Sequence, residues 1–128
     1  MTRLDRSDVL AMLAKGTPLQ LNGADIAGAD LAGLNLSGAD LSYATLTGSS
    51  FVGALLVGAT LWSIDGRGAD FTGANLSGAN LGTADLTEAR LAGAVLTRAS
   101  LQGASLTGVD LADVDLNDTD MRGAIGKI

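Results

Sequence analysis

A large apolar side chain returns at every fifth position of this chain from Leu21 to Met121. Twenty of the 21 positions in this column are large and apolar, and the exception is Gly66. Two residues before each centre the chain has Ala at 14 of 21 positions, and two residues after it has Gly at 14 of 21. The residue just before the centre is Asp or Asn at 12 of 21 positions, so the consensus is A-D/N-L-x-G.

A period of five fits neither a helix nor a long flat strand. A helix needs apolar spacings of three and four residues. In a flat strand, an odd period would send successive large side chains to opposite faces. The chain must therefore turn once in every repeat, so that each Leu and each Ala points to one interior. Gly suits such a corner because it tolerates a positive φ, and Asp or Asn suits it because a short polar side chain bonds to nearby backbone groups.

The runs GADLAGLNLSGADL and GADFTGANLSGANLGTADL resemble the pentapeptide-repeat family, and the resemblance extends over residues 19–124. It implies an all-β solenoid, a right-handed quadrilateral β-helix in which four repeats make one square coil. The 21 repeats then give about five coils. With strands about 4.8 Å apart, the stack is roughly 25 Å tall. Backbone hydrogen bonds run between successive coils in such a stack.

Residues 1–18 precede the repeats and form an N-terminal capping helix and linker in our interpretation. We expect a short α-helix over residues 5–15, with Asp5 as the N-cap and Asp8 three positions later in a capping arrangement. Gly16 ends this helix. The helix is expected to lie over the first coil and to cover its core.

The C-terminal tail, residues 125–128, holds no comparable element. The last coil would then leave apolar groups and unpaired backbone at its outer edge, and such an edge favours pairing with another chain. Members of the family that the sequence resembles include dimers joined through their C-terminal ends. We therefore expect a homodimer through the C-terminal coil, and the alternative is a monomer closed by its short tail.

Two departures from the repeat concern the interior. Ile64 replaces the small residue and Gly66 replaces the large one, so the exchange conserves volume. The alternative is a local bulge that presents Trp62 or Arg67. Phe51 and Phe71 stand twenty residues apart, so with four repeats per coil their rings stack within one interior column.

Other departures concern the outward positions, which are mostly polar. A rigid apolar patch that contains Trp is a candidate for binding a protein partner. The alternative is scattered surface apolar residues, which are normal. With Arg67 from the alternative bulge, the candidate partner-binding residues are Val52, Leu55, Val57, Trp62 and Arg67.

The composition argues against catalysis. The chain has no Cys and no His, which removes disulfides, thiolate metal sites and the commonest general base. An interior filled with Leu and Ala leaves no pocket of converging polar groups. We therefore expect that this protein is not an enzyme and that it binds no cofactor and no metal. Five acidic residues in the last coil lack the Gly and the terminal Glu of an EF-hand, and we interpret them as a solvated rim that protects the edge. The alternative is a negative surface that contacts a basic partner. This acidic rim comprises Asp110, Asp113, Asp115, Asp118 and Asp120.

Charge and hydropathy limit the classes of partner and the location that we expect for this protein. The net charge of −6 disfavours direct binding to nucleic acid or to an anionic membrane. No run of about twenty apolar residues is present, and the N-terminus does not resemble a signal peptide, so we expect a cytoplasmic protein. The leading hypothesis is a non-catalytic module that presents rigid flat faces to a protein partner. The alternative, implied by the family resemblance, is an acidic DNA mimic that binds a type II topoisomerase such as DNA gyrase and gives drug or toxin resistance.

Overall fold

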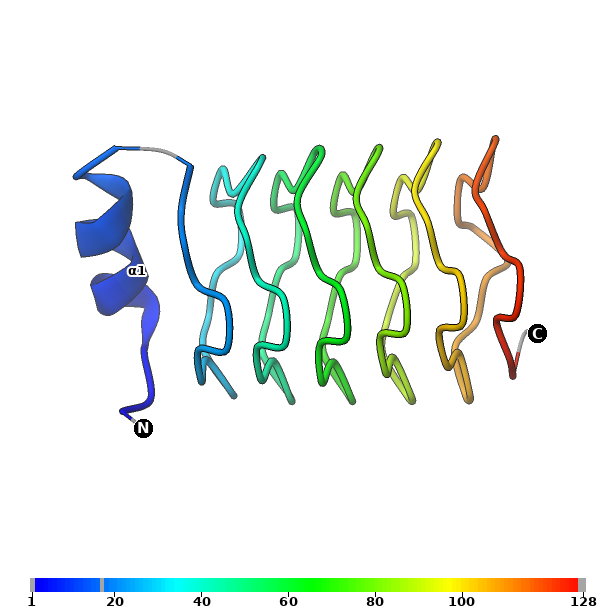
Figure 1. Ribbon diagram of the computed structural model, residues 1–128, viewed down its shortest axis with the longest axis horizontal. Helices are drawn as coiled ribbons and strands as arrows, with labels where there is room; N and C mark the ends of the chain where they lie inside the picture. The colour runs from blue at the N-terminus through cyan, green and yellow to red at the C-terminus, as the bar shows by residue number, and fades with distance from the viewer. Residues whose placement is uncertain (1, 17, 127–128) are drawn as a thin grey trace.

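A computed structural model describes residues 2–16 and 18–126 of the chain. Within these residues one helix, α1 (Arg6–Leu13), stands at one end of a stack of coils (Figure 1). The coils are joined by parallel bridges between residue i and residue i+20, from Gln20 with Asp40 to Ser105 with Ile125. A spacing of twenty residues confirms four repeats per coil. Each side of a coil contributes one bridging residue, so the described chain has no extended strand.

The twenty-residue register defines four flat faces, each named after its column of inward centres. Face A is centred on residues 21, 41, 61, 81, 101 and 121, face B on 26, 46, 66, 86 and 106, face C on 31, 51, 71, 91 and 111, and face D on 36, 56, 76, 96 and 116. The large side chains and the Ala column fill the interior. The rings of Phe51 and Phe71 stack as expected, with centroids 5.0 Å apart and planes 12° apart.

The corners explain the rest of the consensus. Gly73, which is typical, has φ +69°, a left-handed conformation that other residues adopt only with strain. The acidic residue of the repeat accepts a hydrogen bond from the backbone two positions later, as Asp70 Oδ1 does from Thr72 N at 2.9 Å. Six corners carry a side chain in place of Gly and still have a positive φ: Tyr43, Ser63, Thr83, Glu88, Arg98 and Asp118.

The helix α1 is shorter than the predicted 5–15 and begins and ends inside that range. Asp5 is its N-cap, and Asp5 and Asp8 each accept a hydrogen bond from the other's backbone N–H. Val9 is fully buried in the same apolar core as the first coil. Arg6 Nη1 donates to the backbone oxygen of Ala32 at 3.0 Å. These contacts hold the helix against the start of the stack.

The exchange at Ile64 and Gly66 is one of packing. Ile64 is buried, and a Cβ added to Gly66 would lie 3.2 Å from Ile64 Cδ1 and 3.0 Å from Leu86 Cδ2. The backbone remains regular there, since Gly66 N donates to Asp85 O at 2.8 Å. The structure therefore favours the volume-conserving interpretation over a local bulge.

Candidate interaction surfaces

The four apolar candidates lie on three successive faces of one coil. Leu55 and Val57 flank the buried centre of face D and are each 43% exposed. Val52 lies on face C and Trp62 on face A, and they are 39% and 38% exposed. Together they form an apolar band that wraps around three sides of the solenoid. Leu55 and Val57 thus share one face, and Trp62 lies on the next.

Tyr43 is an exposed aromatic residue that the sequence reasoning missed. Its side chain is 66% exposed, and its backbone N donates to Trp62 O at 2.9 Å, so the two aromatic residues are neighbours on face A. Tyr43 stands at a corner position where the repeat has Gly, with φ +61°. An aromatic residue in the glycine column is the signal that could have revealed it, because a corner side chain can only point outward.

Trp62 borders a shallow groove on face A. Its ring covers Gly82 in the next coil, which is buried as a result. Beyond the ring, a groove of about 430 Å³ continues past Thr83 and Gln102 to Arg122. The groove exists because Gly103 and Gly123 bring no side chains to this face. Trp62, which is partly exposed, thus stands beside a shallow and mostly apolar hollow.

Arg67, the remaining candidate, is held by its own neighbour. Its Nε and Nη2 donate to the two carboxylate oxygens of Asp65, each at 2.8 Å. This fork lowers the pKa of Asp65, first through the side-chain hydrogen bond from Arg67 and further through its backbone N–H and charge. The guanidinium is therefore engaged within face B and is separated from the apolar band.

The acidic rim is spread over three faces. Asp110 and Asp113 belong to face C, Asp115 and Asp118 to face D, and Asp120 to face A. Asp120 accepts hydrogen bonds from Arg122 Nη2 at 2.7 Å and Nε at 2.9 Å. These bonds, with the Arg122 backbone N–H, lower the pKa of Asp120 to about 2. Across residues 2–16 and 18–126, no three acidic side chains gather in a way that could hold a metal ion.

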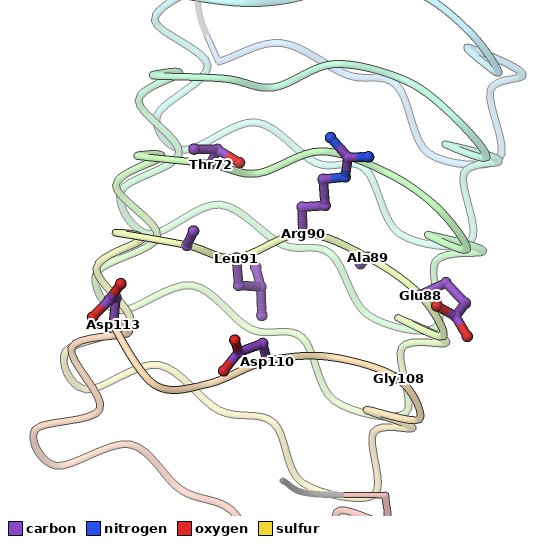
Figure 2. A pocket seen from close by; sticks show the side chains of 9 residues that line it. Thr72, Glu88, Ala89, Arg90, Leu91, Gly108, Asp110 and Asp113 are labelled. Carbon is purple, nitrogen blue, oxygen red and sulfur yellow. The ribbon is translucent and has the colours of Figure 1, made fainter.

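Face C is split between its last two segments, residues 89–93 and 109–113. Elsewhere on this face each centre donates to the next coil, as Phe71 N does to Arg90 O at 2.7 Å. The corresponding bonds from Leu91 to Asp110 and from Gly93 to Ala112 are absent, as is the bridge between Arg90 and Asp110. A cleft of about 450 Å³ lies there (Figure 2). The sequence reasoning did not predict this opening.

The repeat pattern identifies the chain's relatives. The model of the family described as Pentapeptide repeats matches it in eight copies, over residues 20–58, 49–87 and 84–123. The chain belongs to the pentapeptide-repeat family. No curated protein matches its sequence.

Two solved pentapeptide-repeat proteins are similar over most of the chain. Rfr23 from the cyanobacterium Cyanothece 51142 is 28% identical, covers 87% of this chain and 88% of its own, and has a TM-score of 0.70. The protein alr5209 from Nostoc PCC 7120 is 30% identical, covers 87% of this chain and 94% of its own, and has a TM-score of 0.66. The predicted architecture is thus confirmed as the right-handed quadrilateral β-helix of this family.

Pentapeptide-repeat proteins are in general structural modules without catalytic activity. The described part of this chain has no helix that is both long and apolar enough to cross a membrane. What distinguishes it from a bare repeat are the apolar band, the acidic rim and the cleft on face C. Any function particular to this pentapeptide-repeat protein must use surfaces of this kind, because the interior is filled.

Proposed function

We propose that this protein is a non-catalytic interaction module that binds a protein partner through its rigid faces. The observation that carries the proposal is the exposed Trp62, whose ring lies on Gly82, together with the exposed Leu55 and Val57 on the adjacent face of the same coil. Exposed aromatic anchors of this kind are enriched among residues that dominate binding energy. Arg67 is left out of this surface because Asp65 holds it.

Rigidity supports the same proposal. The band sits on backbone segments bonded on both sides to neighbouring coils: Leu55 N donates to Leu34 O, and Leu56 N donates to Asn75 O. Side chains anchored on such a backbone lose little conformational freedom when a partner binds, so less binding free energy is consumed by ordering.

Affinity capture with quantified recovery tests this function. Tagged wild type, Trp62→Ala and the control Gln102→Ala, which alters another exposed residue of face A, are exposed to the same cell extract. We expect one or more proteins to be recovered with wild type and with Gln102→Ala, and at least tenfold less with Trp62→Ala. Equal recovery by all three would remove the apolar band from the function.

A second candidate function rests on the distribution of charge. Eight of the 12 acidic residues of the repeats lie on the adjacent faces B and C: Asp25, Asp65, Asp85, Glu88, Asp30, Asp70, Asp110 and Asp113. Such a surface supports an acidic DNA mimic that binds a type II topoisomerase. Pairing of Asp65 with Arg67 weakens this potential. A supercoiling assay with purified gyrase tests this function. We expect inhibition or drug protection at micromolar protein, and the absence of both effects would exclude the function.

The ends of the stack carry two structural proposals. We propose that α1 caps the first of about five coils, since Val9 is buried there.

We also propose that a second copy packs on the last coil, where Met121 is only partly buried and Ile125 is 62% exposed. Analytical ultracentrifugation should then give a dimer for wild type and a monomer for Ile125→Asp, and a wild-type monomer at 100 μM would refute the dimer. A cytoplasmic location remains a prediction from the sequence.

A further inference from the structure

The split on face C leaves two parallel backbone edges without hydrogen-bond partners in the protein. On the edge at residues 89–93, the N–H groups of Leu91 and Gly93 and the oxygen of Ala89 have no partner. On the facing edge, the N–H of Asp110 is also unpaired. Unpaired backbone groups in a row form the template on which another strand can pair. The two edges flank the 450 Å³ cleft.

Two Val residues in the Ala column border the split. Val109 and Val114 stand where the preceding coil has Ala89 and Ala94, and they bracket the face C segment of the last coil. Val109 is fully buried, so its added volume lies between the coils. At Ile64 the same enlargement is compensated by Gly66 and the backbone bonds remain. Leu111 brings no such compensation, but neither does Leu36 beside the buried Leu34, where Leu36 N still donates to Leu55 O at 2.7 Å.

The edge at residues 89–93 is the firmer of the two. Its other side is fully bonded to the preceding coil, since Arg90 N donates to Ala69 O at 2.9 Å and Phe71 N donates to Arg90 O. Leu91 is buried beneath it. A strand that pairs with Leu91 and Gly93 would therefore meet a preformed edge, and side chains at alternate positions would face the apolar interior and the solvent.

The charges around the cleft are mostly negative. Figure 2 shows Glu88 at one end of the cleft, Asp113 at the other and Asp110 on the far edge. Glu88 lies over Gly108 of the next coil, since its carboxyl carbon is 2.7 Å from the place that a Cβ on Gly108 would occupy. Arg90 is the one basic residue among those that line the cleft, against three acidic ones, and its side chain extends toward Thr72 on the preceding coil. The cleft thus complements a positively charged ligand.

We propose that the cleft binds an extended, basic peptide segment, which pairs as an added strand with the backbone edge at residues 89–93. Small side chains of the peptide face Ala89 and Leu91, and Lys or Arg side chains alternate with them toward Glu88 and Asp113. This site differs in position and chemistry from the apolar band around Trp62, so the failure of one proposal would leave the other intact.

A titration monitored by NMR amide exchange tests the site. The probe is the end-capped peptide Lys-Ala-Lys-Ala-Lys, and the charge control is Glu-Ala-Glu-Ala-Glu. In the free protein the amides of Leu91 and Gly93 should exchange at least a hundredfold faster than their counterparts at Phe71 and Gly73. Saturation with the lysine peptide should slow both by at least tenfold, and the glutamate peptide should have no effect.

Two sets of variants separate strand pairing from general attraction. Val109→Ala with Val114→Ala should close the split, protect Leu91 and Gly93 without peptide, and weaken binding at least tenfold. Glu88→Gln with Asp113→Asn changes only exposed side chains, so folding is retained. This pair should weaken binding about tenfold, whereas Asp25→Asn on face B should leave it unchanged.

Any one of four results would overturn the proposal. It is overturned if Leu91 and Gly93 are already protected in the free wild type, or if the lysine peptide does not bind at 1 mM. It is also overturned if binding leaves their exchange unchanged, or if Asp25→Asn weakens binding as much as the pair at Glu88 and Asp113 does. The last two results would assign the affinity to the overall negative charge of the protein.

Discussion

The indole ring of Trp62 lies on Gly82 in the next coil, so closely that a Cβ added to Gly82 would be 2.4 Å from the ring atom Cζ3. Gly82 does not adopt the left-handed conformation of the corner glycines, so its backbone does not require Gly. It is Gly because the ring occupies the space. The pair fixes the orientation of the exposed tryptophan on face A.

Gly82→Ala should therefore displace the ring of Trp62. Overpacking of this kind costs about 1–3 kcal/mol when neighbours cannot move, but Trp62 is 38% exposed and can swing outward. We expect a red shift of the fluorescence of this single tryptophan with a loss of stability at the low end of that range. In a Trp62→Ala background the same substitution should cost much less, because only Asn80 Oδ1, at 3.1 Å, then lies close to the added Cβ. An unchanged emission spectrum with unchanged stability would contradict the contact.

The exchange of Ile64 and Gly66 can be reversed by design. Ile64→Ala alone should destabilise the protein by about 2–5 kcal/mol, because it leaves a cavity. Gly66→Leu alone should destabilise it through overpacking against Ile64 and Leu86. Both changes together restore the consensus repeat and should leave the free energy of unfolding within about 1.5 kcal/mol of wild type. Urea denaturation measures all three, and additive losses in the double variant would refute the packing interpretation.

Corners that lack Gly should be strained. Arg98 has φ +59°, and a left-handed conformation costs a residue with a Cβ about 1 kcal/mol. Arg98→Gly should therefore stabilise the protein by about that amount, net of any entropy gained by the unfolded chain. The matched control Gly73→Ala, at φ +69°, should destabilise it similarly. Chemical denaturation of both variants is the measurement, and a destabilised Arg98→Gly would show that the guanidinium outweighs the corner strain.

Asp120 should titrate near pH 2. Its pKa is lowered from 3.8 to about 2, mainly by the side-chain hydrogen bond from Arg122 and then by the backbone N–H of the same residue. The folded pKa lies below the unfolded one, so the stabilisation is complete above about pH 4 and is lost as the pH falls toward 2. Carbon-13 NMR of the carboxyl group should show this pKa rising in Arg122→Ala and unchanged in Arg90→Ala. An ordinary pKa in wild type would contradict the fork.

The sequence predicted the fold well because the same five-residue pattern recurs along the whole stack of coils. The apolar column fixed the interior, the register of twenty followed from four repeats per coil, and the stacking of Phe51 on Phe71 followed from that register. The cap of α1 was equally local, since Asp5 and Asp8 act within one turn. The predicted range was too long because it included the N-cap Asp5 and extended past the C-cap Ala14.

The surfaces were less predictable because they depend on contacts between coils. The pattern placed Trp62 outside but could not show its ring on Gly82, and it gave no sign that Asp65 would hold Arg67. The split on face C was missed for a similar reason. Val109 differs from the consensus Ala by two methyl groups, and the loss of the bonds between residues 89–93 and 109–113 is visible only in the structure.

Photo-cross-linking from chosen positions tests most directly whether the apolar band is the surface that binds a partner. Benzoylphenylalanine replaces Trp62 or Val57, and the control position is Asn117, which lies in the same outward column of face D as Val57. After irradiation in cells, we predict the same cross-linked partner protein from positions 62 and 57 and none from 117. Equal cross-linking from all three positions, or none from 62 and 57, would contradict the proposed function.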